Sequence, residues 1–89
     1  MNLTALKYFV EVAKEGSISR AANNMHVTQP TITRQLKLLE EEVGQSLYIR
    51  HAKGIELTKA GIILQERGRE IIKIEQTALL EIGNNTTLR

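Results

Sequence analysis

One short segment of the chain, QPTITR at residues 29–34, gathers side chains that can hydrogen-bond to the edges of nucleic-acid bases. The amide of Gln29 can bond adenine at two points, and the guanidinium of Arg34 can do the same with guanine. Thr31 and Thr33 can offer hydroxyl and methyl contacts. We therefore expect these residues to read base pairs, with an ordinary exposed helix face as the alternative interpretation.

Pro30 lies within this segment and is the single proline of the chain. Thr28 is predicted to cap a helix here, which places Pro30 in the first turn, where a missing N–H costs nothing because those groups have no partner within the helix. The ring of Pro30 can also touch a thymine methyl, so this residue joins the candidates for base readout. Gly44 is expected to end the helix. At about 100° per residue, its inward face carries four apolar side chains: Ile32, Leu36, Leu39 and Val43.

The distribution of charge indicates a polyanionic partner more clearly than the net charge does. The formal net charge is only +2, but no acid occurs between Gly16 and Leu39. Carboxylates at the start of the helix would repel phosphate, so their absence suits a nucleic-acid partner. The run Glu40–Glu42 is expected to form a solvated helix end, with a cation in the core as an alternative partner for Glu40. Six side chains are candidates for phosphate contacts, each with a helix cap or a solvated charge as the alternative: Ser17, Ser19, Thr28, Lys37, Arg50 and Lys53.

Two further helices are predicted before this one. Apolar residues at spacings of three and four predict a helix over residues 3–15. A shorter helix follows, capped by Ser17 or Ser19, and its two consecutive alanines let another helix approach closely. Two helices joined by a turn of three or four residues, spanning about residues 18–37, are typical of a helix-turn-helix.

The second half of the chain predicts a hairpin and a long helix. Apolar residues on either side of the sequence HAKG predict two short strands over about residues 46–58, with Gly54 in the turn. Thr58 is expected to cap a helix over about residues 59–82, which Gly83 would end. Such a helix is too long to bury its apolar stripe against three short helices, so half of it needs another surface. The apolar residues available for that surface include Leu64, Ile71, Ile74 and Ala78.

Composition argues against several other functions. The 89 residues allow one compact domain with a short appendage, and no cysteine is present for disulfides or thiolate chemistry. His26 and His51 lack the partners for a metal site. No nucleophile–base pair or glycine-rich phosphate loop indicates an enzyme, so no catalytic residue, cofactor or metal is predicted. Without a signal peptide or an apolar stretch of roughly 18 residues, we expect a soluble, cytoplasmic chain with no membrane partner.

Together these motifs make the chain resemble the N-terminal winged helix-turn-helix domain of LysR-type bacterial transcriptional regulators. The resemblance spans about residues 3–75, in one order and with matching spacing, and it is densest in TQPTITRQL at residues 28–36. Met25, Tyr48 and Thr33 stand where leucine, phenylalanine and serine are usual. The other matching positions are Leu6, Phe9, Val12, Ala13, Gly16, Ser17, Ala21, Ala22, Leu39, Glu40, Gly44, Leu47, Arg50, Leu57, Thr58, Ala60 and Gly61.

The resemblance implies a mainly helical fold, with a three-helix core and a two-stranded wing over residues 1–58 and a linker or dimerisation helix over residues 59–83. It also implies that the third helix enters the major groove of double-stranded DNA and that the wing lies near the phosphate backbone or the minor groove. Linker helices of two copies would pair antiparallel, with Leu64, Ile71, Ile74 and Ala78 at the dimer interface, so that a dimer or tetramer binds an interrupted palindrome. Residues 84–89 would begin a hinge, and we expect no effector-binding domain or small-molecule site in this chain.

A helical protein-interaction module is the competing hypothesis. In that case exposed apolar residues such as Leu38 and Leu80 would contact a protein partner. Binding to random duplex DNA that weakens steeply with added salt separates the two, because phosphate contacts release counterions and apolar contacts do not.

Overall fold

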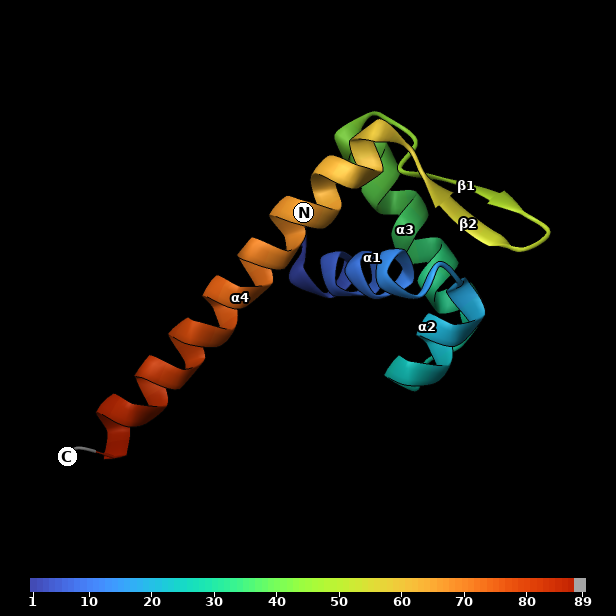
Figure 1. Ribbon diagram of the computed structural model, residues 1–89. Helices are drawn as coiled ribbons and strands as arrows, with labels where there is room; N and C mark the ends of the chain where they lie inside the picture. Colours follow the sequence, from blue (N-terminus) through green and yellow to red (C-terminus); the bar gives the residue numbers. More distant parts are fainter. Residues whose placement is uncertain (88–89) are drawn as a thin grey trace.

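The computed structural model describes residues 1–87, with the side chains of residues 1–84. Figure 1 shows short helices packed together, a hairpin that projects to one side, and a long helix that extends away from the others. The predicted winged helix-turn-helix fold, mainly helical with a long final helix, is confirmed. In chain order the elements are α1 (Leu3–Glu15), α2 (Ile18–Met25), α3 (Gln29–Val43), β1 (Tyr48–His51), β2 (Gly54–Leu57) and α4 (Lys59–Thr87).

The helix starts and ends follow from capping residues. Ser17 caps α2 and Thr28 caps α3, each accepting a hydrogen bond from the N–H three residues further on, at 3.1 and 3.3 Å. Pro30 lies in the first turn of α3, as predicted. Gly16 and Gly44 end α1 and α3 in the left-handed conformation, with φ of 67° and 76°. The local sequence therefore sets where each of these helices begins and ends.

The apolar faces of α1, α2 and α3 meet in one core. The two consecutive alanines of α2, Ala21 and Ala22, are 0% and 3% exposed and let the neighbouring helices approach closely. The prediction that Val43 faces inward is wrong, because this last residue of α3 lies beyond the helices that cover the core and is 38% exposed. The core consists of Phe9, Val12, Ile18, Ala21, Ala22, Ile32, Leu36, Leu39 and Leu47.

The wing is an antiparallel pair of strands with its turn at the sequence HAKG. Tyr48 lies opposite Leu57, and His51 lies opposite Gly54. Gly54 has a φ of 135°, and a Cβ atom there would lie 2.3 Å from the carbonyl oxygen of Gly16. The N–H of the next residue, Ile55, donates to that same oxygen at 3.0 Å. The hairpin is therefore joined to the turn between α1 and α2.

A set of hydrogen bonds around Leu47 joins α3, the wing and α4. The carboxylate of Glu40 accepts the backbone N–H of Leu47 at 2.8 Å, and the carbonyl of Leu47 accepts the N–H of Thr58 at 3.1 Å. Thr58 caps α4 as predicted, because its hydroxyl oxygen accepts the N–H of Gly61 at 3.1 Å. The expectation of a solvated Glu40, or of one paired with a cation, is wrong, since the following loop folds back and its partner is a backbone N–H.

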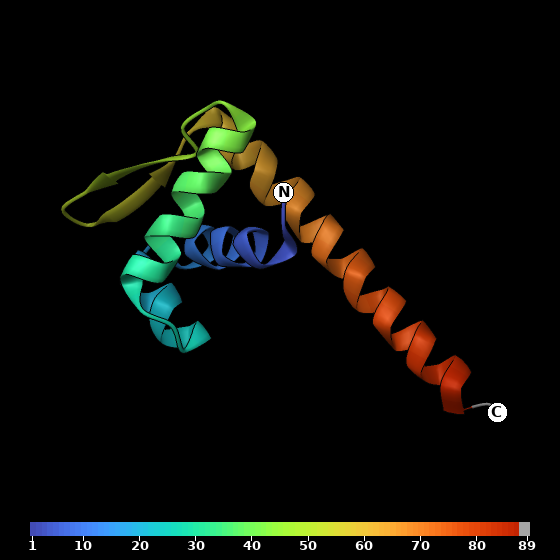
Figure 2. The ribbon, with the colours of Figure 1, turned by 180° about the vertical axis from the view of Figure 1, so that it is seen from behind.

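The second half of α4 extends clear of the domain, as Figure 2 shows from behind. Gly68 is buried against α1, whereas every described side chain after Glu75 is exposed. The predicted end at Gly83 is wrong, because α4 continues to Thr87. Each residue added to a formed helix gains a hydrogen bond, which offsets the weak helix propensity of one glycine. Within the described residues, no helix combines the length and apolarity needed to span a membrane.

Two glycines of α4 provide a matched test of the packing around Leu47. A Cβ atom on Gly61 would lie 2.0 Å from the backbone carbonyl oxygen of Leu47, whereas one on Gly83 would meet nothing within 4 Å. We expect Gly61→Ala to lower the free energy of unfolding by about 1–3 kcal/mol, because overpacking against backbone outweighs the gain in helix propensity.

Gly83→Ala serves as the control and is expected to leave the free energy of unfolding unchanged or raise it by at most about 1 kcal/mol. Urea unfolding followed by circular dichroism measures both variants. Undiminished stability of Gly61→Ala would contradict the close contact between α4 and Leu47.

Candidate nucleic-acid interface

The outward face of α3 presents the residues predicted to read bases. Gln29, Pro30 and Arg34 are exposed, and Thr31 and Thr33 are half-buried. The opposite face of the same turns is buried in the core, so these side chains can point only toward solvent or along the flanks of the helix. The structure therefore brings all five predicted base-reading residues to the first two turns of one helix.

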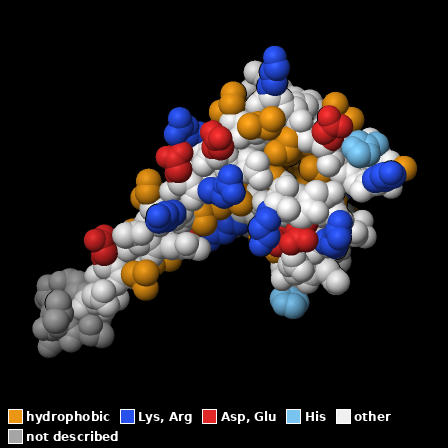
Figure 3. All heavy atoms as spheres, viewed as in Figure 1, with side chains coloured by type: hydrophobic (Ala, Val, Ile, Leu, Met, Phe, Trp, Pro, Cys, Tyr) orange, Lys and Arg blue, Asp and Glu red, His pale blue; other side chains and the backbone are white. Residues whose placement is uncertain are grey.

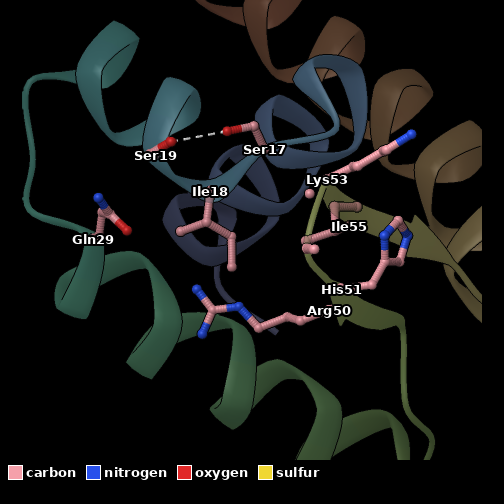
Figure 4. Close-up of a pocket in the computed structure, with 10 residues that line it drawn as sticks. Ser17, Ile18, Ser19, Gln29, Arg50, His51, Lys53 and Ile55 are labelled. Atoms are coloured by element: carbon pink, nitrogen blue, oxygen red, sulfur yellow. Dashed lines mark hydrogen bonds between the residues drawn. The ribbon is translucent and has the colours of Figure 1, made fainter.

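A surface hollow of about 290 Å³ separates the start of α3 from the wing. Ser17 and Ser19 line it from the start of α2, Gln29 from α3, and Arg50 and Lys53 from the wing. Figure 4 shows the guanidinium of Arg50 extending from β1 toward α3, whereas the side chain of Lys53 extends away from it. Four of the six predicted phosphate contacts thus surround one hollow.

A second, more open hollow connects the wing directly to the face of α3. Its lining residues are Gln29, Pro30, Thr33 and Arg50. Arg50, predicted to contact phosphate, therefore lies beside three of the residues predicted to read bases. No acidic side chain of the described residues lines either hollow, so both favour an anion.

The hydroxyl groups near these hollows are paired with one another. The oxygens of Ser17 and Ser19 lie 3.0 Å apart, and those of Thr28 and Thr31 lie 2.8 Å apart. A hydroxyl has one proton and two lone pairs, so the capping bonds of Ser17 and Thr28 use lone pairs only. Each pair also uses one proton internally and keeps the other. One hydroxyl proton in each pair can therefore be donated to an outside acceptor such as a phosphate oxygen.

The cations in the central part of the chain lack acidic partners. Lys7, Lys14 and Arg67 form ion pairs with carboxylates at 3.0, 3.5 and 2.7 Å. Between residues 16 and 60, by contrast, no lysine or arginine forms an ion pair, and Figure 3 shows basic side chains on the projecting wing. Lys37 belongs to this group and is exposed on α3, beyond Arg34. The unpaired cations of this part are Arg20, Arg34, Lys37, Arg50, Lys53 and Lys59.

Two further titratable groups of the wing are His51 and Tyr48. His51 and Glu56 lie across the strands, with 3.8 Å between Nε2 and Oε1, so that a protonated His51 would offset the one acid of the hairpin. Burial raises the pKa of the Tyr48 phenol above its ordinary value of 10.0, and the carboxylate of Glu40 adds to the rise while Arg50 opposes it. Tyr48 is therefore neutral at physiological pH, and it adds no negative charge near the phosphate candidates.

A separate apolar surface runs beside α4. In both ribbon views the N-terminus lies next to this helix (Figures 1 and 2). Of the four residues predicted to form a dimer interface, Leu64 is half-buried and packs partly on the core of its own chain. Ile71 and Ile74 are 38% and 69% exposed, and Ala78 is exposed. An apolar hollow of about 340 Å³ is lined by Met1, Val43, Gln45, Leu47, Ala60, Ile63, Leu64, Arg67 and Ile71.

Sequence reasoning missed two residues that shape the interface. Asn24 donates to the carboxylates of Glu11 and Glu15 at 2.8 and 3.2 Å, which ties α2 to α1 and engages two acids. His51, considered above only as a metal ligand, is exposed and lines the hollow between α2 and the wing. Its position next to Arg50 was the available signal, whereas nothing local indicates the contacts of Asn24.

Comparison with known proteins identifies the family. Residues 3–62 match the family described as "Bacterial regulatory helix-turn-helix protein, lysR family". The chain is 42% identical over 76 residues to the HTH-type transcriptional regulator TfdT of Cupriavidus pinatubonensis, covering 85% of this chain and 33% of the relative. It is 41% identical over 90 residues to the nitrogen assimilation regulatory protein nac of Klebsiella aerogenes, covering 100% of this chain and 30% of the relative. The chain thus spans about a third of the length of these relatives.

Solved structures agree with this result over nearly the whole chain. The chain is similar to a CbnR DNA-binding domain in a DNA complex, with a TM-score of 0.89, 38% identity and full coverage of both chains. It is also similar to a BenM DNA-binding domain in complex with catB site 1 DNA, with a TM-score of 0.93, 28% identity and 97% coverage of both chains. The chain belongs to the lysR family of bacterial regulatory helix-turn-helix proteins and corresponds to the DNA-binding domain of that family.

Proposed function

We propose that this chain binds double-stranded DNA in a sequence-dependent manner, with the first turns of α3 in the major groove. The observation that carries this proposal is the outward face of α3, on which Gln29, Thr33 and Arg34 face solvent or flank it with no carboxylate partner in the described residues. An α-helix fits the major groove, and amide and guanidinium groups match the hydrogen-bonding edges of adenine and guanine. The CbnR and BenM complexes, in which similar domains are bound to DNA, support the same role.

The residues around the two hollows are proposed to hold the phosphate backbone. Arg50 and Lys53 supply charge from the wing, while Ser17 and Ser19 supply a hydroxyl proton and the free N–H groups at the start of α2. Thr28 and Lys37 would contact phosphate at the two ends of the exposed part of α3. Such contacts fix the register of α3 on the duplex and add affinity that falls with salt, without selecting a sequence.

We also propose that two copies pair through α4, so that each places one α3 on half of an interrupted palindrome. The apolar hollow beside α4 and the exposed side chains of Ile71 and Ile74 support this pairing, because covering them removes apolar surface from water. A longer form of the protein would then assemble as a dimer or a tetramer. Bound to chromosomal DNA, the protein would act in the bacterial cytoplasm as a regulator of transcription, and no catalytic role is proposed.

Arg34→Ala tests base reading. The substitution is expected to cost about 1–3 kcal/mol at one base pair and to relax selectivity there, because a bidentate contact is lost. Sites are first selected from a random duplex library, and fluorescence anisotropy then measures binding to each single-base-pair variant of the selected site. Arg69→Ala removes the same charge from an exposed position of α4 and is the control. An equal loss for every sequence would show that Arg34 does not read a base.

Lys53→Ala tests the phosphate contacts of the wing. Binding to selected and scrambled duplexes should weaken alike, and the slope of log affinity against log salt should become shallower by about one, because one fewer counterion is released. The matched control, Lys73→Ala, removes a lysine from the exposed side of α4. An unchanged slope for Lys53→Ala would remove this lysine from the proposed interface.

Ile71→Glu tests the pairing through α4. A carboxylate at the edge of the apolar hollow would be desolvated in a dimer, so the variant is expected to sediment as a monomer under conditions in which the unaltered chain is a dimer. Ile62→Glu is the control, since Ile62 is 50% exposed and does not line the hollow. Sedimentation of Ile71→Glu at an unchanged mass would count against this interface.

A further inference from the structure

The attachment of α4 to α1 depends on a very close crossing at Gly68. A Cβ atom at this position would lie 2.9 Å from Cδ1 of Leu6 and 3.1 Å from Cγ2 of Val10. Leu6 is only 1% exposed, so its side chain cannot move aside into solvent. Because Gly68 has no side chain, α4 can pack closely against α1 at this point.

A second contact lies two turns further along α4. Nζ of Lys7 lies 3.0 Å from Oε1 of Glu75, and the two side chains are 40% and 26% exposed. Oε1 is shielded from solvent and has no aligned hydrogen-bond donor, so among the described residues the ammonium of Lys7 is its compensating charge. Every described side chain of α4 beyond Glu75 is exposed. Within the described side chains, Glu75 is consequently the last residue of α4 that is partly buried.

We infer that the Gly68 crossing and the Lys7–Glu75 ion pair together set the angle between α4 and the DNA-binding part, and hence the half-site separation that a dimer prefers. This inference rests on the proposed pairing of two copies through α4. The 29-residue helix acts as a lever. A tilt of about 10° at Gly68 moves the end of the helix, about 28 Å further on, by roughly 5 Å, which equals about one and a half base pairs at a rise of about 3.4 Å.

The two members of the ion pair differ in what their loss leaves behind. Removing Lys7 leaves a shielded carboxylate without a cation, and tilting α4 outward is the simplest way to return it to water. Removing the charge of Glu75 leaves a lysine whose flexible chain can turn into solvent. The effect of Lys7→Gln on the angle should therefore exceed that of Glu75→Gln.

The experiment measures spacing preference separately from half-site affinity. Duplexes that carry two copies of the selected half-site, separated by spacers of every length over one helical turn, compete for the full chain, and bound spacers are counted by sequencing. The unaltered chain should favour one spacing over its neighbours by about tenfold, because only that geometry engages both half-sites without strain. Lys7→Gln should reduce this preference to about threefold or shift it by one or two base pairs, and Glu75→Gln should do so less.

Controls separate this effect from misfolding and from the loss of DNA binding. Glu66→Gln removes a carboxylate from an exposed position of α4 that forms no ion pair and does not line the apolar hollow, so its spacing profile should match that of the unaltered chain. Exchanging the charges, with Lys7→Glu and Glu75→Lys together, should restore the original profile. Affinity for an isolated half-site should stay within about twofold in every variant.

Identical spacing profiles for Lys7→Gln, Glu75→Gln and the unaltered chain would overturn the inference. A charge-exchanged variant that keeps the Lys7→Gln profile would overturn the role of the ion pair. If the unaltered chain fails to bind even an isolated half-site, the proposed DNA binding itself fails, which is a different result.

Discussion

The interface depends on the burial of one face of α3. Ile32 and Leu36 are 0% exposed and Leu39 is 2% exposed, so three points on one side of a stiff helix are held in a close-packed core. A helix held in this way cannot rotate, and the direction of every side chain on its other face is therefore fixed as well. Ala21 and Ala22 contribute by being small, since larger side chains there would push α3 outward together with Gln29 and Arg34.

Local chemistry explains how much of the fold could be predicted from the sequence. Ser17, Thr28 and Pro30 act on N–H groups within three residues of themselves, so the helix starts were predictable, and the alternation around Gly54 predicted the wing. The five predicted base-reading residues lie close together because they are neighbours in sequence at the start of one helix. The roles of Glu40, Asn24 and Lys7 were not predictable, because their partners lie 7, 13 and 68 residues away in sequence. The end of α4 was predicted too early, because Gly83 weakens a helix without forcing it to stop.

Two surfaces of this small domain use different physical forces. The face formed by α3 and the wing carries unpaired cations and hydroxyl protons, so its interactions are electrostatic and are screened by salt. The surface beside α4 is apolar, so the proposed association there would gain from the removal of water and would be far less sensitive to salt. The two surfaces share no residues, so a substitution in one need not alter the other. The core between them fixes how the two surfaces are oriented relative to each other.

The hydrogen bond from the N–H of Ile55 to the carbonyl of Gly16 joins the hairpin to the turn at the end of α1, a distant part of the chain. Isolated two-stranded hairpins are marginal in water, so this one owes its persistence to a turn that exists only once α1 and α2 have formed. The amide of Ile55 should consequently exchange with solvent deuterium as slowly as the core amides do. Ordering of the wing and folding of the helices then form one cooperative event, and a partly folded chain would have no preformed wing.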